Sequence, residues 1–67
     1  MDKGQVKWFN NAKGIGFIRP ADGGEDVFVH YSVISMEGYK TVAANQDVTY
    51  ELKSGPKGNF AATVVLE

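Results

Sequence analysis

Apolar residues recur at every second position in several short runs of this chain, and no window of about 11 residues shows the helical period. β-Branched and aromatic residues fill these runs, while glycine, proline and asparagine separate them. The pattern predicts five strands: Gln5–Asn10, Ile15–Pro20, Val27–His30, Val48–Lys53 and Asn59–Leu66. An open sheet of such short strands leaves edges that invite aggregation, so closure into a small barrel is favoured.

The connections between the predicted strands narrow the choice of barrel. The tight Ala21–Glu25 connection predicts a hairpin of strands two and three, and Ser54–Gly58 predicts a loop. Tyr31–Ile34 is expected to form one helical turn that closes an end of the core, followed by a long loop over Ser35–Asn45. The long loop favours an all-β, five-stranded antiparallel OB-fold barrel, with an SH3-like barrel as the alternative.

The chain has 67 residues, so we expect a single domain over residues 1–67. A domain of this size buries only about 60% of its unfolded surface and is marginally stable. Without cysteine it forms neither a disulfide nor a thiolate metal site. No apolar run reaches the roughly 18 residues of a membrane span, and Met1–Gly4 lacks the apolar segment of a signal peptide. We therefore expect a cytoplasmic protein with no membrane partner.

Period-2 alternation sorts the side chains of strands two and three between two faces. Ile18 and Val29 take the core face, whereas Phe17, Phe28 and His30 take the other face. Water does not favour exposed rings, but unpaired nucleobases stack on them with about 1–3 kcal/mol per base. The alternation therefore predicts a surface patch for nucleic acid, with ordinary core packing of the two Phe rings as the alternative.

The first and last strands leave the orientation of two rings open. Strict alternation places Trp8 on the core side with Val6, but a bulge would turn Trp8 outward. Phe60 either points outward as an extra ring or follows Ala62 and Val64 inward to fill a barrel end. The other positions expected to face inward are Val48, Tyr50 and Leu52 in strand four and Leu66 in strand five.

The net charge of −1 argues against a uniformly basic nucleic-acid binder. Lys7, Lys13 and Arg19 nevertheless lie in or beside the aromatic strands, and most acidic residues lie elsewhere in the sequence. A basic face on an acidic protein is thus an open alternative. Taken singly, such lysines serve solubility, but their interleaving with aromatic residues favours contacts with phosphate.

Sequence signals for an enzyme or a metal site are absent. The Lys13–Gly16 segment is neither a P-loop nor a dinucleotide fingerprint, because no helix is expected after it. The single histidine has no cysteine or paired carboxylate beside it, and Asp22–Asp26 lacks the ligand alternation and distal Glu of a calcium loop. We therefore expect no catalytic activity, no cofactor, no metal and no small-molecule substrate.

Several motifs together resemble those of the bacterial cold-shock proteins. They occur in family order at Lys7–Asn10, Lys13–Ile18, Val27–Tyr31, Gly38–Lys40 and Gly55–Gly58, so the similarity covers the chain from about Gly4 to Val64. The resemblance implies an OB barrel that binds single-stranded RNA and DNA with low sequence specificity. It also implies an RNA chaperone and a regulator of transcription and translation that traps open strands without ATP.

The resemblance also implies a set of binding residues. This set comprises Lys7, Trp8, Lys13, Phe17, Phe28, His30, Tyr31 and Tyr39, to which we add Phe9, Lys57 and Phe60 as candidates. Two positions depart from the family pattern. Ile15 stands where the family usually has an aromatic residue, so one stacking platform is lost. Phe60 stands where the family often has Gln, so it supplies another ring if it points outward.

A peptide-binding module is the alternative function from a different class, because SH3-like barrels also expose rings and bind proline-rich segments. Lys7 and Lys13 favour nucleic acid, since a proline-rich ligand needs rings whereas a nucleic acid needs rings and cations. The sequence leaves open whether RNA or DNA is the target. A monomer is expected, and exposed strand edges make a swapped dimer conceivable.

Overall fold

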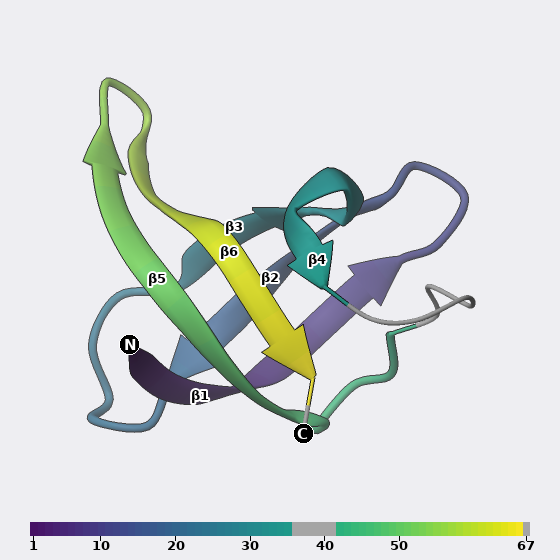
Figure 1. The fold of residues 1–67 in the computed structure, drawn as a ribbon, viewed down its shortest axis with the longest axis horizontal. Coiled ribbons are helices and arrows are strands. Elements are labelled where there is room, and N and C mark those ends of the chain that lie inside the picture. The colour runs from purple at the N-terminus through teal and green to yellow at the C-terminus, as the bar shows by residue number, and fades with distance from the viewer. Residues whose placement is uncertain (36–41, 67) are drawn as a thin grey trace.

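The structure is a computed structural model that describes residues 1–35 and 42–66. Within these residues, six strands and one short 3₁₀ helix make up the fold (Figure 1). They are β1 (Asp2–Asn10), β2 (Ile15–Pro20), β3 (Val27–His30), η1 (Tyr31–Val33), β4 (Ile34–Ser35), β5 (Asp47–Gly55) and β6 (Gly58–Leu66). The five predicted strands and the helical turn are thus confirmed, and β4 is a short addition.

The strands close into a barrel because β3 pairs with β6 as well as with β2. The order β3-β2-β1-β5-β6 is antiparallel throughout, but the closing pair β3–β6 is parallel, and so is β4–β6. An odd number of strands cannot alternate in direction all the way around a closed barrel. The all-β OB-type barrel is therefore confirmed, while the expectation that every pair is antiparallel was wrong.

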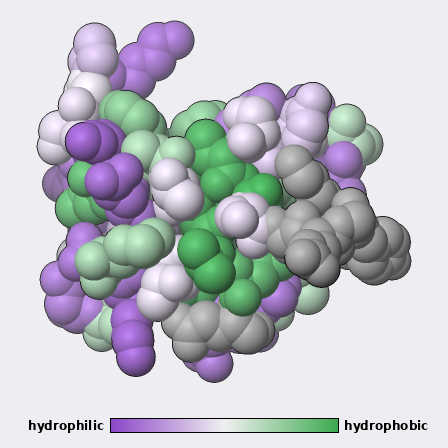
Figure 2. Space-filling model, in the orientation of Figure 1, coloured by the Kyte–Doolittle hydropathy of each residue, from purple (hydrophilic) through white to green (hydrophobic). Residues whose placement is uncertain are grey.

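The core is formed by side chains from the inner faces of the strands and by Val42, which lies between β4 and β5. Its buried members among the described residues are Val6, Ile18, Val27, Val29, Ile34, Val42, Val48, Tyr50, Ala61 and Val64. Val33 and Leu66 pack against them and are partly buried. The predicted turn over Tyr31–Ile34 is divided between η1 and the first residue of β4, and both Val33 and Ile34 contact the core as predicted. On the side of the molecule in Figure 2, apolar side chains reach the surface where β6 passes η1 and β4.

A β-bulge in β1 settles the orientation of Trp8. Val6 lies opposite Ile18 and Trp8 lies opposite Phe17, so Lys7 is an extra residue in the pairing with β2. Because of this residue, Val6 remains in the core at 1% exposure while Trp8 points outward at 43% exposure.

A second irregularity changes the predicted pattern of β6. Glu51 lies opposite Thr63 and Leu52 lies opposite Ala61, so Ala62 is the extra residue. Ala61 instead of Ala62 therefore takes the buried position, which corrects the expected face, and Phe60 points outward at 38% exposure.

The β5–β6 hairpin also differs from expectation, because it extends beyond the end of the barrel (Figure 1). Leu52 lies near this end and is 42% exposed, although alternation predicted it to be buried. The predicted Ser54–Gly58 loop is wrong in extent, since β5 reaches Gly55 and β6 begins at Gly58. No helix long and apolar enough to cross a membrane occurs in the described part of the chain.

Candidate nucleic-acid interface

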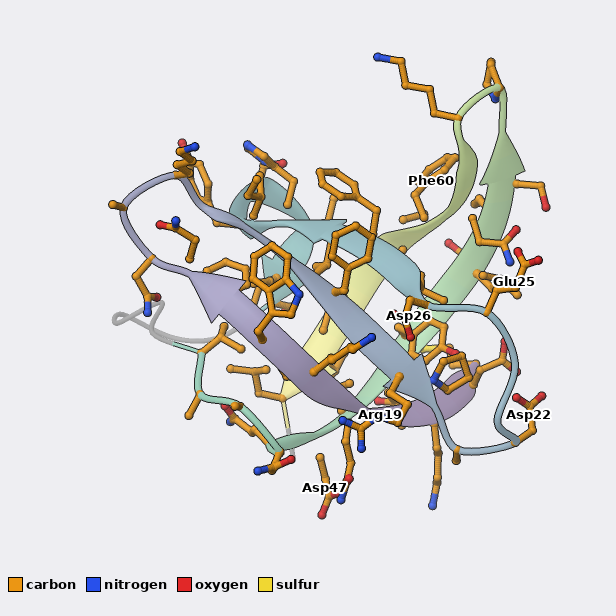
Figure 3. All side chains as sticks on the ribbon, turned by 180° about the vertical axis from the view of Figure 1, so that it is seen from behind. Arg19, Asp22, Glu25, Asp26, Asp47 and Phe60 are labelled. Carbon is orange, nitrogen blue, oxygen red and sulfur yellow. The ribbon has the colours of Figure 1, made fainter. Side chains whose placement is uncertain are left out.

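Four aromatic side chains lie side by side on the outer face of β1, β2, β3 and β6. In the strand register, Trp8 lies opposite Phe17, Phe17 lies opposite Phe28, and Phe28 lies opposite Phe60. Phe17 is half-buried, and the other three rings are between 37% and 43% exposed. We call these four residues the aromatic row; Figure 3 views this side of the barrel and labels Phe60 on β6.

Three rings of the aromatic row pack against one another. The ring centroids of Trp8 and Phe17 are 5.4 Å apart with the planes at 55°, and those of Phe17 and Phe28 are 5.7 Å apart at 74°. Tilted and edge-to-face pairs of this kind each contribute about 0.5–1.5 kcal/mol beyond the burial of their area. Trp8, Phe17 and Phe28 therefore form a preformed apolar surface, with Phe17 opposite Phe28 on the outer face of the β2–β3 pair.

A second aromatic pair, His30 and Tyr31, lies where β3 ends and η1 begins. Their ring centroids are 4.6 Å apart. The Nδ1 atom of His30 accepts a hydrogen bond of 3.2 Å from the backbone N–H of Ser32 and lies 2.9 Å from its hydroxyl. With Nδ1 as the acceptor, the neutral ring carries its proton on Nε2, which leaves that N–H as a donor for a ligand.

The turn before β2 positions the ring of Tyr31, which is 48% exposed. Gly14 has φ of +72°, and a Cβ at this position would lie 2.3 Å from Cδ1 of Tyr31. The backbone N–H of Tyr31 also donates to the carbonyl oxygen of Gly14 at 2.8 Å. Glycine is therefore required here both by the backbone conformation and by the close approach of the ring. Ile15 lies opposite His30 and puts a half-buried aliphatic side chain beside this pair.

Both positive and negative side chains surround the aromatic row, so this face is not uniformly basic. The Nζ atom of Lys7 lies 2.8 Å from Oδ2 of Asp26, although the two residues are far apart in sequence. Asp26 and Glu25 both line a hollow beside Phe17 and Phe28, and Figure 3 shows them where the chain enters β3. An exposed ion pair such as this one contributes about 0–1 kcal/mol.

Two hollows adjoin the aromatic side chains. One, of about 510 Å³, is lined by Phe17, Phe28, Lys57, Asn59 and the carboxylates of Glu25 and Asp26. The other, of about 280 Å³, is lined by Phe9, Lys13, Tyr31 and the turn over residues 11–14. The structure thus brings Lys57 to one hollow and Lys13 to the other, which places a cation beside each group of rings.

Some predicted residues lie apart from the aromatic row. Phe9 packs against the core, and its Cδ1 atom would be 2.6 Å from a Cβ at Gly16, so this ring reaches only the smaller hollow. Arg19 is exposed on β2 and lines a separate hollow with Lys3 and Asp47. Tyr39 and Lys40 lie outside the described residues.

Sequence reasoning missed the polar groups that rim the larger hollow. Glu25 and Asp26 immediately precede β3, whose first residue, Val27, pairs with Ile18 of β2. This hairpin register was the signal that could have placed the two carboxylates near the outer face of β2. Asn59 is held by a 3.2 Å hydrogen bond that its Oδ1 atom accepts from the hydroxyl of Ser54. Within the described residues, no group of three His, Cys, Asp or Glu side chains is arranged to hold a metal ion.

Comparison with known protein families and proteins gives a consistent match. Residues 2–67 match the family described as the 'Cold-shock' DNA-binding domain. The chain is 60% identical over 65 residues to cold shock-like protein CspD of Escherichia coli K12, which covers 97% of this chain and 88% of that protein. It is 58% identical over 62 residues to cold shock-like protein CspC of the same strain, covering 92% of this chain and 90% of that protein.

Proposed function

The chain belongs to the cold-shock domain family of nucleic-acid-binding proteins, and from that premise we propose that it binds single-stranded RNA and DNA with low sequence specificity. The observation that carries the proposal is the aromatic row, because four rings from four strands lie next to one another at the surface. Every base has a π-face, so stacking tolerates any base and contributes about 1–3 kcal/mol each.

The cations contribute less than the rings in this mechanism. Lys13 and Lys57 lie beside the two aromatic groups and meet phosphates at either side of the bound strand. Lys7 must exchange Asp26 for a phosphate, so its net contribution to affinity is small. Each phosphate contact to a single strand contributes a slope of about −0.7 to the dependence of log affinity on log salt. We therefore expect log affinity to fall with log salt concentration with a slope of about −1.4, the contribution of Lys13 and Lys57.

Binding of unpaired bases also accounts for chaperone activity. A protein that binds the open form of an RNA hairpin, and not the paired form, shifts the equilibrium toward the open form by mass action. This mechanism needs neither ATP nor a catalytic group. The same capture of open strands would alter transcription and translation wherever an RNA hairpin controls them.

Titration of the intrinsic fluorescence tests the proposal directly. Trp8 is the only tryptophan of the chain and is part of the aromatic row. We expect oligo(dT) and oligo(rU) to quench its emission at low ionic strength, and a proline-rich peptide of equal length to leave it unchanged. Phe17→Ala and Phe28→Ala should each weaken binding by about 1–3 kcal/mol. Emission that no oligonucleotide alters, with the fold intact, would rule the proposal out.

A further inference from the structure

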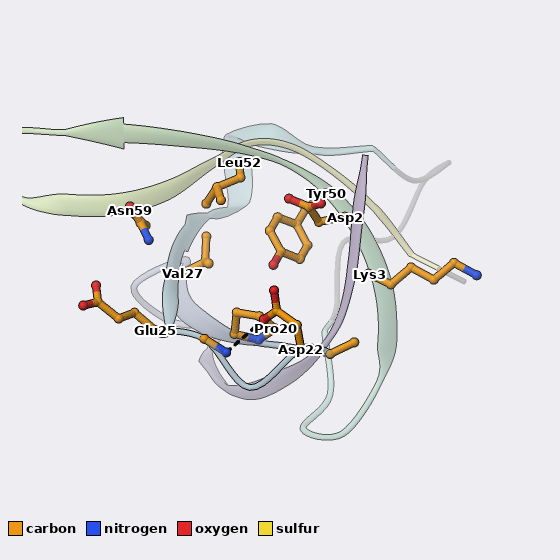
Figure 4. A pocket seen from close by; sticks show the side chains of 11 residues that line it. Asp2, Lys3, Pro20, Asp22, Glu25, Val27, Tyr50, Leu52 and Asn59 are labelled. Atoms are coloured by element: carbon orange, nitrogen blue, oxygen red, sulfur yellow. Dashed lines mark hydrogen bonds between the residues drawn. The ribbon is translucent and has the colours of Figure 1, made fainter.

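A hollow of about 240 Å³ lies at the end of the barrel and contains none of the rings of the aromatic row (Figure 4). Its walls come from the start of β1, the end of β2, the connection to β3, and the facing positions of β5 and β6. The volume is below that of a typical drug-sized site and suits a group as small as an amino-acid side chain.

The hydroxyl of Tyr50 faces this hollow. The residue is 1% exposed and belongs to the core, yet Figure 4 shows its hydroxyl pointing into the hollow. Among the described residues this hydroxyl has no hydrogen-bond partner, and no polar side-chain atom is both sealed from solvent and unpartnered. The hydroxyl of this buried residue is therefore accessible to a ligand from the hollow that it lines.

The charge around this hydroxyl is negative. Asp2 and Asp22 line the hollow together with Tyr50. Burial raises the pKa of Tyr50, and the negative charges of Asp2 and Asp22 raise it further. Asp22 accepts a 2.9 Å hydrogen bond from the backbone N–H of Gly24 through Oδ1, which holds its carboxylate in place. In Figure 4 this carboxylate points into the hollow, whereas the ammonium group of Lys3 points away from it. Within the described part of the chain, neither Asp2 nor Asp22 forms an ion pair.

The apolar walls indicate which kind of cation fits. Val27, Leu52 and Pro20 line the hollow together with the polar groups, which gives the exposed Leu52 side chain a place in a site. A hard metal ion needs several oxygen ligands around it, and no such group exists among the described residues. An alkylammonium group uses both features, because its methylenes contact the walls while its N–H groups donate to carboxylates and to the phenol oxygen.

We propose that this hollow is a binding site for a primary alkylammonium group, with Asp22 and the Tyr50 hydroxyl as acceptors, Asp2 as a further negative charge in the wall and Leu52 against the alkyl chain. A free diamine and a lysine side chain share this chemistry. The site is separate from the aromatic row and does not depend on the proposed binding of nucleic acid.

Titration of ¹⁵N-labelled protein with 1,4-diaminobutane, followed by two-dimensional amide NMR, tests the proposal. We expect saturable shifts that are confined to residues 2–3, 20–25 and 50–52. Sodium chloride at equal ionic strength and n-butanol should not reproduce them. Nα-Acetyl-lysine amide is the second probe: tighter binding of the diamine identifies a free polyamine as the ligand, and equal binding identifies a side-chain ammonium.

Two variants and a matched control separate the site from general electrostatics. Asp22→Asn should weaken diamine binding about three- to fivefold, the effect of one exposed ion pair, while its amide oxygen still accepts from Gly24. Tyr50→Phe keeps the buried ring and removes only the hydroxyl, so it should weaken binding without unfolding the protein. Asp47→Asn makes the same charge change outside the hollow and should bind as the parent does. Equal weakening by Asp47→Asn, or shifts that salt alone reproduces, would overturn the site.

Discussion

Replacement of Phe60 with Gln should shorten the nucleic-acid binding surface by one stacking position. Phe60 is the last ring of the aromatic row and has Phe28 as its neighbour in the strand register. Short oligonucleotides can occupy the first three rings, so they should bind the variant and the parent alike. Longer oligonucleotides reach the fourth ring and should lose affinity in the variant.

The size of the loss follows from the exposure of the ring. Phe60 is 38% exposed and Phe28 is 37% exposed, so the two present similar areas to a base. The ring of Phe60 also covers Gly55, where a Cβ would lie 3.1 Å from its Cε1 atom, so part of the ring is unavailable. We therefore expect the lower part of the stacking range, about 1–2 kcal/mol, or about 5- to 30-fold in affinity.

Fluorescence anisotropy of labelled oligo(dT) of increasing length is the suitable assay, with thermal unfolding as the check on the fold. Val65→Gln is the matched control, because Val65 lies on the same strand with 39% exposure and lies outside the aromatic row. If Phe60→Gln binds every length as tightly as Val65→Gln does, the row ends at Phe28 and the stacking argument for Phe60 is wrong.

Three further changes test the surroundings of the rings and the core. Asp26→Asn frees Lys7 for phosphate, so affinity for oligo(dT) should rise and the salt slope should steepen by about 0.7 in a titration from low to moderate salt. Gly14→Ala should destabilise the protein by more than about 1 kcal/mol in urea unfolding, because φ is +72° and the new methyl group would collide with the Tyr31 ring. The pKa of Tyr50 is raised in the folded state, first by burial and then by nearby carboxylates. Its contribution to stability is therefore complete below about pH 10, the pKa in the unfolded chain, and is lost as pH rises through the folded pKa. Tyr50→Phe should reduce this alkaline loss in denaturation midpoints measured from about pH 8 to 11.

Local alternation predicted the orientation of side chains wherever the strand pairing is regular. The β2–β3 hairpin has no register shift, so Phe17 and Phe28 lie on the outer face and Val29 lies in the core as period 2 requires. Alternation left the orientations of Trp8 and Phe60 open, because Trp8 directly follows one extra residue and Phe60 lies two positions before another. Alternation does not show where such a residue occurs. The orientation of Leu52 was predicted wrongly for the same reason, because the register shift between β5 and β6 falls between Glu51 and Leu52 and the alternation of β5 does not continue past it.

The mixed charge of the interface could not be read from sequence proximity. Asp26 is remote from Lys7 along the chain, yet the path of β1, β2 and the connection to β3 brings Oδ2 of Asp26 to 2.8 Å from Nζ of Lys7. The parallel closure, in contrast, follows from counting, since five strands in a ring require one parallel pair. The charges of the site could therefore not be predicted without knowing how strands that are distant in sequence are aligned with one another.

The position of the aromatic row links nucleic-acid binding to the closure of the barrel. Trp8, Phe17 and Phe28 belong to three consecutive antiparallel strands, whereas Phe60 reaches the row only through the parallel β3–β6 pair. A nucleic-acid strand that stacks on both Phe28 and Phe60 therefore spans the β3–β6 pair that closes the barrel. Such a ligand binds the closed barrel better than a barrel in which β3 and β6 have separated. Its binding free energy therefore stabilises the β3–β6 pairing. In the proposed binding mode, the β3–β6 contact at Phe28 and Phe60 therefore contributes both to ligand affinity and to closure of the barrel.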